Sequence, residues 1–161
     1  MGEASPLIRI RCAVVVTLPP SHGLLVARQN NAPFWVLPGG TLEVGETLAQ
    51  CATRELLEEC DLTIALTQLV ALGEWVDPAK GKHVIDAAFT ADYASGPTQW
   101  EGDLPENLNE LKTVTLPEFE ALPFKPDWLK PLIVEAWASG WQQWPTTVYA
   151  LPSSIVPAKL N

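Results

Sequence analysis

One stretch, from Gly40 to Leu62, constrains this chain more than any other. It reads GTLEVGETLAQCATRELLEECDL. Thr47, followed three residues later by Gln50, is a capping-box pattern that predicts the start of a helix. Most of the residues that follow are good helix formers. At about 100° per residue, the apolar positions between Leu48 and Leu56 form one stripe, so the stretch predicts an amphipathic helix packed on a core.

Three carboxylates lie next to that apolar stripe. Glu55, Glu58 and Glu59 fall within an arc of roughly 100° beside the stripe and partly over it. Two such charges ~4 Å apart repel by ~4 kcal/mol at an effective dielectric of ~20, so stability does not explain the cluster. A divalent cation removes the conflict, and ligands that are all oxygen suit Mg²⁺ or Mn²⁺. The alternative is a solvated acidic face that carries Arg54 as an ion partner.

Fixed offsets within the stretch weigh against that alternative. Gly40, Glu46 and the run from Arg54 to Leu62 resemble the Nudix box, G-x5-E-x7-R-E-U-x-E-E-x-G-U, where U is a bulky aliphatic residue. The departure is Asp61, which stands where the family pattern has Gly. Asp tolerates the left-handed conformation expected at a helix C-terminus better than most residues, so we expect a small cost in stability and no loss of chemistry.

The resemblance implies an α/β/α sandwich with a mixed β-sheet between helices. The order of strands and helices agrees with that fold, and we expect a single domain over residues 1–161, with a core of about 7–139 and a tail of 141–161. The predicted strands are 7–18, 23–28, 34–37, one or two within 62–76, 83–93, 111–116 and 147–151. The other predicted elements are a turn at Gly39-Gly40, a loop over 94–109, a connecting segment over 117–126, and a helix over 127–139 that Asp127 caps and Gly140 closes.

The resemblance also implies an activity, which is Mg²⁺-dependent hydrolysis of the pyrophosphate link in a nucleoside diphosphate attached to a group X. Carried over residue by residue, Glu58, Glu59 and the carbonyl of Gly39 are expected metal ligands, with Mn²⁺ as a possible substitute for Mg²⁺. Glu55 is expected to be either a ligand or the base that activates water. Family members differ on the base, and some take a glutamate from the loop before the last core strand, where this chain offers Glu106 and Glu110.

Two further residues of the box have expected supporting roles. Arg54 resembles the residue that orients the glutamate cluster, a role that its planar guanidinium suits. Glu46 resembles a residue at the start of the helix, near the site.

Substrate contacts are less constrained by the sequence. Arg9, Arg11 and Arg28 are candidates for substrate phosphate, although ordinary edge-strand solubility explains them as well. Trp35 is a candidate for stacking on a base, although core packing is the more common role for such a residue. Trp100, in the predicted loop, is a candidate for covering a base or contacting a second subunit.

Pro78 gives the one cue to the substrate class. It lies sixteen residues after Leu62, near the offset of a proline that marks ADP-ribose-cleaving Nudix enzymes, although Asp77-Pro78 is also a good turn sequence. We therefore favour ADP-ribose or a related sugar nucleotide. The alternatives are a pyrophosphohydrolase for nucleoside triphosphates, including oxidised ones, and a non-catalytic Nudix-fold regulator that binds nucleotides.

Composition narrows the partners. The net charge of −9 argues against duplex nucleic acid and against an anionic membrane. No apolar run reaches the ~18 residues of a membrane span, and the N-terminus lacks the basic start of a signal peptide.

Cys12, Cys51 and Cys60 are odd in number and are not spaced as a zinc site, which predicts free thiols and a cytoplasmic location. A homodimer is possible, because dimers are common in the family.

Overall fold

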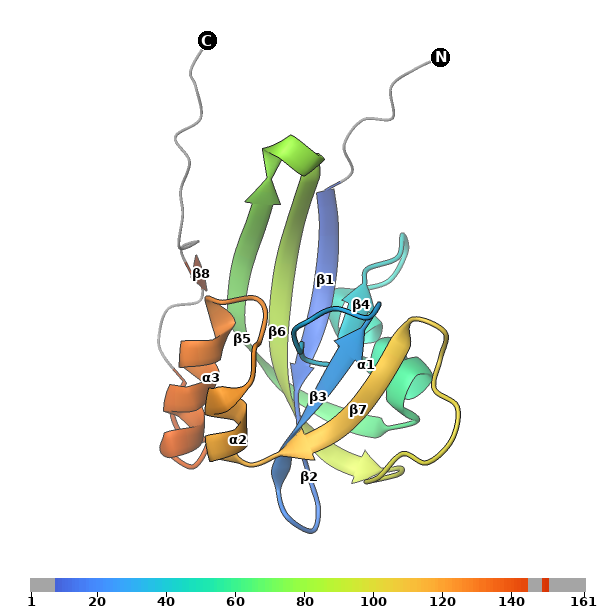
Figure 1. Cartoon of the computed structure of the whole chain (residues 1–161), viewed down its shortest axis with the longest axis vertical. Helices are drawn as coiled ribbons and strands as arrows, with labels where there is room; N and C mark the ends of the chain where they lie inside the picture. The colour runs from blue at the N-terminus through green and yellow to red at the C-terminus, as the bar shows by residue number, and fades with distance from the viewer. Residues whose placement is uncertain (1–7, 145–148, 151–161) are drawn as a thin grey trace.

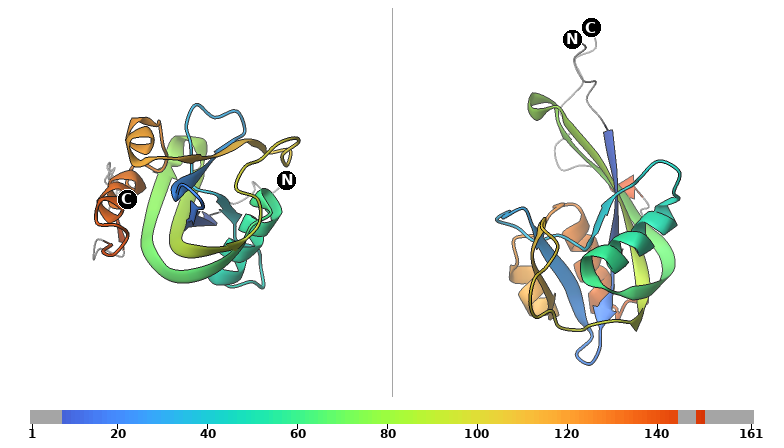
Figure 2. Two further views of the ribbon diagram at one scale, coloured as in Figure 1. Left: turned by 90° about the horizontal axis from the view of Figure 1, so that it is seen from below. Right: turned by 90° about the vertical axis from the view of Figure 1, so that its right-hand side faces the viewer.

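Two sheets stand between helices in the computed structural model, which describes residues 8–144 and 149–150. One sheet has the strand order β4-β1-β6-β5-β8 and the other β2-β3-β7. Helix α1 (Leu48–Cys60) lies on one side of the strands, and α2 (Leu116–Ala121) and α3 (Leu129–Ala138) lie on the opposite side (Figures 1 and 2). Because strand β1 is parallel to β6 and antiparallel to β4, the sheet is mixed, and the predicted α/β/α sandwich is confirmed.

The strands and the single short helical turn have these bounds: β1 Ile8–Val15, β2 Thr17–Leu18, β3 Gly23–Gln29, β4 Gly39–Thr41, β5 Thr63–Asp77, the 3-10 turn η1 Pro78–Lys80, β6 Lys82–Ser95, β7 Leu108–Val114 and β8 Tyr149–Ala150.

The second half of strand β1, from Cys12 to Val15, is buried on both faces. Cys12 and Val14 pack in the apolar cluster that contains α1, whereas Ala13 and Val15 pack in the cluster that contains α3. A strand between two layers needs apolar residues at successive positions, unlike a strand with one wet face. The uninterrupted apolar run at the end of β1 meets this need, and the strand fixes the position of β4 beside it.

Helix α1 begins and ends as the sequence predicts. The Thr47 hydroxyl accepts a hydrogen bond from the Gln50 N–H at 3.1 Å, and the Gln50 side chain accepts one from the Thr47 N–H at 2.8 Å. After the helix, Asp61 takes the left-handed conformation with φ 57°. Leu56 is fully buried, so the predicted apolar stripe faces the core.

The N-terminal strand prediction needs a correction. The chain turns out of β1 after Val15, and only the short β2 forms the hairpin with β3, pairing Thr17 with Leu24. The predicted strand 7–18 is therefore two strands, and its first residue lies outside the described part of the chain. The full length of β1 instead pairs with β6, a partner distant in sequence.

The strand predicted at 34–37 is also wrong. Trp35 and Val36 make only isolated bridges, to Phe124 and Ala27. The strand in this region is β4, which the sequence suggested as a turn. Gly39 lies against β1 so closely that a Cβ built on it would be 2.0 Å from the Cys12 carbonyl oxygen. Glycine thus allows a close strand pairing here, in addition to its role in turns.

Three predictions in the second half of the chain differ from the structure. Helix α2 occupies what was predicted as a connecting segment, and its Thr115 and Glu118 form a capping box. Asp127 does not cap α3; its carboxylate binds Lys125 Nζ at 2.7 Å, and the helix begins after Trp128. The last core strand, β7, begins three residues earlier than predicted, at Leu108. Helix α2 was missed because its six residues show no full helical period.

Other predictions agree with the structure. The region 62–76 holds a single long strand, β5, which begins at Thr63, and β6 covers the predicted strand 83–93. The predicted strand 147–151 overlaps β8, and its other residues lie outside the described ranges. The three cysteines are buried and free. Within the described part of the chain, no helix has the length and apolar character to cross a membrane.

Candidate active site

Arg54, on α1, is the centre of an ion-pair network in the candidate site. Its Nε and Nη2 atoms donate to the two carboxylate oxygens of Glu46, at 3.0 and 2.7 Å. Its Nη1 atom donates to Glu55 at 2.8 Å and to Glu58 at 3.1 Å. Two parallel hydrogen bonds from one guanidinium to one carboxylate, here called the paired fork, fix the orientation of both groups. The structure therefore brings together Glu46, Arg54, Glu55 and Glu58, as the sequence predicted.

The fork also changes the ionisation of Glu46. Hydrogen bonds from Arg54, followed by the backbone N–H of Glu43, lower the pKa of the Glu46 carboxyl from its ordinary 4.5 to about 2. The same contacts raise the pKa of Arg54, chiefly through Glu46. Glu46 is thus a fixed anion that holds the guanidinium beside the helix.

Glu55 lies directly beneath the backbone of Gly40. A Cβ built on Gly40 would be 2.3 Å from the Glu55 carboxyl carbon. Any larger residue would therefore push the carboxylate away from its place, since a contact under 3.0 Å must be relieved by movement. This gives a physical reason for glycine at the first position of the box. The side chain of Glu55 is only 13% exposed.

Glu59 lies deepest of the three helix glutamates and is 8% exposed. Its carboxylate accepts hydrogen bonds from Gln29 Nε2, at 3.2 and 3.4 Å to its two oxygens, and from Asn107 Nδ2 at 3.3 Å. The backbone N–H of Gly39 is a further donor. Burial, with the negative charge of Glu55 second, raises the pKa of the Glu59 carboxyl.

The three predicted glutamate ligands lie on the C-terminal half of α1, and each accepts hydrogen bonds from protein groups. Glu55 and Glu58 face Arg54, while Glu59 faces two amides. Among the described residues, no three side chains of His, Cys, Asp or Glu are already gathered as a metal-binding group. A metal would have to compete with Arg54 for Glu55 and Glu58.

Arg11 is held in place by the protein. Its guanidinium donates to the Leu37 carbonyl at 2.7 Å and pairs with the buried Asp86 at 3.5 Å. Burial raises the pKa of Asp86, and Arg11 opposes that shift. Arg11 therefore ties β1 to the segment just before β4. Arg9, two residues earlier on the same face of β1, is exposed.

The remaining candidates for substrate contact lie around strand β7. Arg28 on β3 forms an ion pair at 3.4 Å with Glu110, which lies opposite it on β7. Trp35 is 8% exposed and packs in the core on the α2 and α3 side, with Lys112 Nζ 4.2 Å from the centre of its ring. Trp35 is thus placed as a core residue, which the sequence analysis gave as the more common alternative to stacking on a base.

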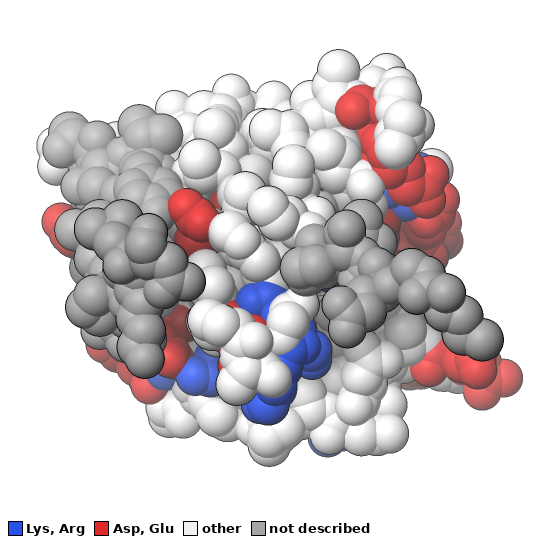
Figure 3. All heavy atoms as spheres, turned by 90° about the horizontal axis from the view of Figure 1, so that it is seen from above, with Lys and Arg blue, Asp and Glu red and all other residues white. Residues whose placement is uncertain are grey.

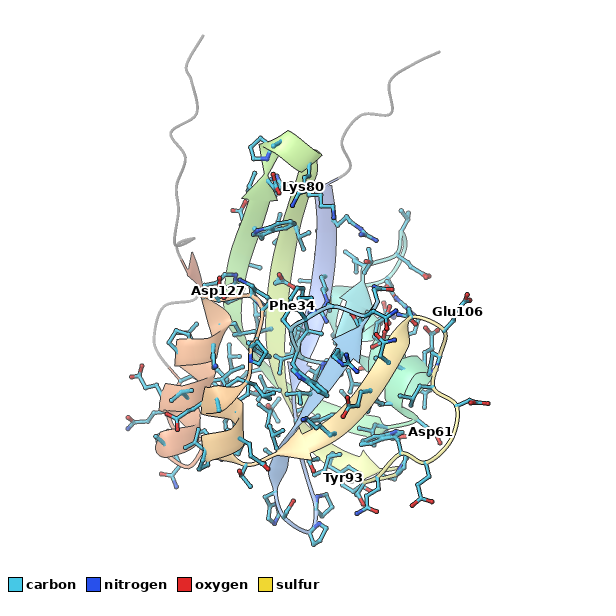
Figure 4. All side chains as sticks on the ribbon, in the orientation of Figure 1. Phe34, Asp61, Lys80, Tyr93, Glu106 and Asp127 are labelled. Carbon is cyan, nitrogen blue, oxygen red and sulfur yellow. The ribbon has the colours of Figure 1, made fainter. Side chains whose placement is uncertain are left out.

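The loop 96–107 connects β6 to β7 and contacts the end of α1. Trp100 packs against the core, and its Nε1 donates to the Cys60 carbonyl at 2.9 Å, while its side chain stays partly exposed. Glu106 is exposed near the start of β7 (Figure 4). The sequence reasoning missed Gln29, Asn107 and Asp86, because each gains its role from a partner distant in the chain.

One end of the molecule gathers positive charge. Figure 3 looks down on the end from which the β5–β6 hairpin projects, and basic side chains cluster near its centre. Lys80 and Lys82, at the turn of the hairpin, are exposed. This local cluster contrasts with the net charge of −9 of the whole chain.

Comparison with known proteins decides the family. A family profile described as "NUDIX domain" matches residues 8–135, most of the chain. The chain belongs to the Nudix family. The match includes β1, the box and α1, β7, and most of α3.

Curated Nudix relatives include hydrolases of two kinds. The chain is 34% identical over 121 residues to the "NAD-capped RNA hydrolase NudC" of Edwardsiella ictaluri, covering 73% of this chain and 43% of that protein. It is 35% identical over 82 residues to the "Putative 8-oxo-dGTP diphosphatase" of Bacillus subtilis, covering 51% of this chain and 55% of that protein. The chain thus spans about half the length of these relatives or less. The prediction that the chain belongs to the Nudix family is confirmed.

A solved structure shares the fold. The "NUDIX hydrolase from Nitrosomonas europaea" matches with a TM-score of 0.68 and 19% identity, covering 87% of this chain and 94% of that one. At this identity the likeness concerns the fold alone.

Proposed function

We propose that this protein hydrolyses the pyrophosphate link of a nucleoside diphosphate derivative with the help of a divalent cation, Mg²⁺ in the cell. The observation that carries the proposal is the arrangement at α1. A paired fork between Arg54 and Glu46 holds the helix start, and Glu55, Glu58 and the buried Glu59 follow along the same helix. All of the carboxylates of the Nudix box are present.

The donor set suits a hard divalent cation. Glu58, Glu59 and the carbonyl of Gly39 are the proposed ligands, with Glu55 beside them, and all of these atoms are oxygens. Glu59 is buried next to the charge of Glu55, a conflict that a cation would relieve. When bound, the cation neutralises phosphate oxygens and makes a water molecule a better nucleophile.

Glu55 is the proposed base. It would accept the proton of the water that attacks phosphorus. The bridging P–O bond then breaks, and the other half of the substrate leaves as a phosphate monoester. With ADP-ribose the products are AMP and ribose 5-phosphate. The confined position of Glu55 beneath Gly40 suits a group that must keep a fixed orientation. Glu106 is the alternative base, because it is exposed on the loop next to the site. Glu110, which pairs with Arg28 across β3 and β7, is the second alternative.

The favoured substrates are ADP-ribose and related compounds in which a nucleoside diphosphate carries a second group. Pro78 supports this choice, although in the structure it starts the turn η1 that Asp77 caps. The relative from Edwardsiella ictaluri is named for an NAD cap, and NAD is also a nucleoside diphosphate joined to a second nucleoside. A second candidate is a nucleoside triphosphate, favoured by the similarity to a protein named as an 8-oxo-dGTP diphosphatase.

A panel of substrates tests the proposal. We would measure kcat/KM for ADP-ribose, NAD, dGTP and 8-oxo-dGTP at one Mg²⁺ concentration and identify the products by chromatography. We expect ADP-ribose or NAD to be preferred by tenfold or more, about 1.4 kcal/mol in transition-state binding. A tenfold preference for a triphosphate would overturn the substrate class but not the hydrolase. No turnover of any substrate would favour the non-catalytic regulator.

A further inference from the structure

Two amide side chains from distant parts of the chain converge on one buried carboxylate. Gln29, at the end of β3, donates to both oxygens of Glu59, and Asn107, at the end of the loop 96–107, donates to one of them. Glu59 is thirty residues from the first of these and forty-eight from the second. Neither amide belongs to the Nudix box.

The segments that carry the two amides are tied to each other. The Asn30 N–H donates to the Asn107 carbonyl at 3.0 Å, so the end of β3 and the end of the loop are joined next to the two donors. The Asn109 side chain accepts a hydrogen bond from the Asn31 N–H. Earlier in the loop, the Trp100 ring N–H donates to the Cys60 carbonyl in the last turn of α1. The amides are therefore held by anchored backbone, which is what a positioning group needs.

The chemistry of the donors differs from that used elsewhere in the site. Glu46 is held by the positive charge of Arg54, which neutralises it. Glu59 is held by uncharged amides and a backbone N–H, which orient a carboxylate while leaving its negative charge for another partner.

We propose that Gln29 and Asn107 are positioning residues that hold the Glu59 carboxylate in the orientation in which it binds the divalent cation. This inference rests on the proposed function, because it needs Glu59 to be a ligand. Hydrogen-bond partners of metal ligands typically change metal affinity by about 10–100-fold when they are removed.

The test measures Mn²⁺ binding to the whole chain by electron paramagnetic resonance, with no substrate present. Gln29→Met keeps the side-chain volume and removes the amide, and Asn107→Ala removes an exposed amide. We expect each substitution to raise the Kd for Mn²⁺ by about 10-fold or more. Gln99→Ala, which removes an exposed amide from the same loop, is the control and should leave the Kd unchanged. Thermal melting of each variant checks that it is folded.

A double-mutant cycle shows whether the amides act through Glu59. In the Glu59→Gln background, Gln29→Met and Asn107→Ala should cause no further rise in Kd, because the ligand that they position is already lost. Steady-state kinetics at saturating Mn²⁺ should show a KM for the substrate close to that of the wild type.

Three outcomes would overturn the inference. If both amide variants bind Mn²⁺ as tightly as the wild type while Glu59→Gln does not, the amides do not position the ligand, and the proposed function is untouched. If the effects of the amide variants add fully to that of Glu59→Gln, the amides act elsewhere. If Glu59→Gln itself binds Mn²⁺ normally, the assignment of Glu59 as a ligand fails, and the inference fails with it.

Discussion

Two glutamates of the box are held in opposite ways at the scale of single residues. Glu46 accepts a paired fork from Arg54 and is a fixed anion. Glu59 is buried and accepts only uncharged donors among its hydrogen bonds in the structure. The first arrangement suits a structural role at the helix start, and the second suits a ligand. The Nudix box pattern contains both residues, but the sequence does not show this difference in their surroundings.

The ionisation of Glu46 gives a prediction about stability in acid. Its pKa is lowered to about 2 in the folded protein, so its pairing with Arg54 stabilises the fold at pH values above its ordinary 4.5. The contribution is lost as pH falls from there toward 2, because in this range the unfolded state takes up a proton that the folded state does not bind. Urea denaturation at a series of pH values should show that Glu46→Gln is less stable than the wild type near neutrality, with the difference shrinking in this acid range.

Glu101→Gln, at an exposed position of the loop, is the control for that series and should follow the wild type throughout. A difference between wild type and Glu46→Gln that stays constant down to pH 2 would contradict the role given to the fork.

The choice of base is tested by three matched substitutions. At saturating Mg²⁺, Glu55→Gln should lower kcat by about 10²–10⁴-fold, the usual contribution of a general base. Glu106→Gln and Glu110→Gln should have much smaller effects, because neither carboxylate is confined against the box glycine as that of Glu55 is. A fall of that size in Glu106→Gln alone would move the role of base to the loop.

At the scale of elements, α1 agrees with the sequence because its signals are local. The capping box of Thr47 and Gln50 and the left-handed residue after the helix depend on neighbours in the chain. Strand β4 and the pairing of β1 with β6 were not predicted, because they depend on partners distant in sequence. Helix α2 could have been found, since Thr115 and Glu118 have capping-box spacing.

Asp61 gives a prediction for the end of α1. The residue has φ 57°, a conformation that costs an L-residue roughly 1–2 kcal/mol and glycine almost nothing. Asp61→Gly should therefore raise the free energy of unfolding, by about 0.5–1 kcal/mol, because Asp bears only part of that cost. Asp61→Ala, measured by the same urea denaturation, should lower it. A glycine variant less stable than the wild type would show that the Asp side chain makes a compensating contact.

At the scale of the whole molecule, the site is assembled from segments that lie far apart in the chain. Gln29 comes from β3, Gly39 from β4, Glu59 from α1, and Asn107 from the loop before β7. The box predicted only the helix glutamates, Arg54, Glu46 and the glycines. The amide donors could not be predicted, because a lone Gln or Asn in a sequence carries no sign of a buried partner.

The central claim is that the glutamates of α1 carry a cation-dependent hydrolysis. A magnesium titration of turnover, with the best substrate of the panel, tests it in Glu59→Gln, with Glu120→Gln as a control at an exposed glutamate of α2. We expect Glu120→Gln to behave as the wild type. Glu59→Gln should need more Mg²⁺ for half-maximal turnover and should lose at least ~10²-fold in kcat. Near-normal turnover of Glu59→Gln at low Mg²⁺ would contradict the claim.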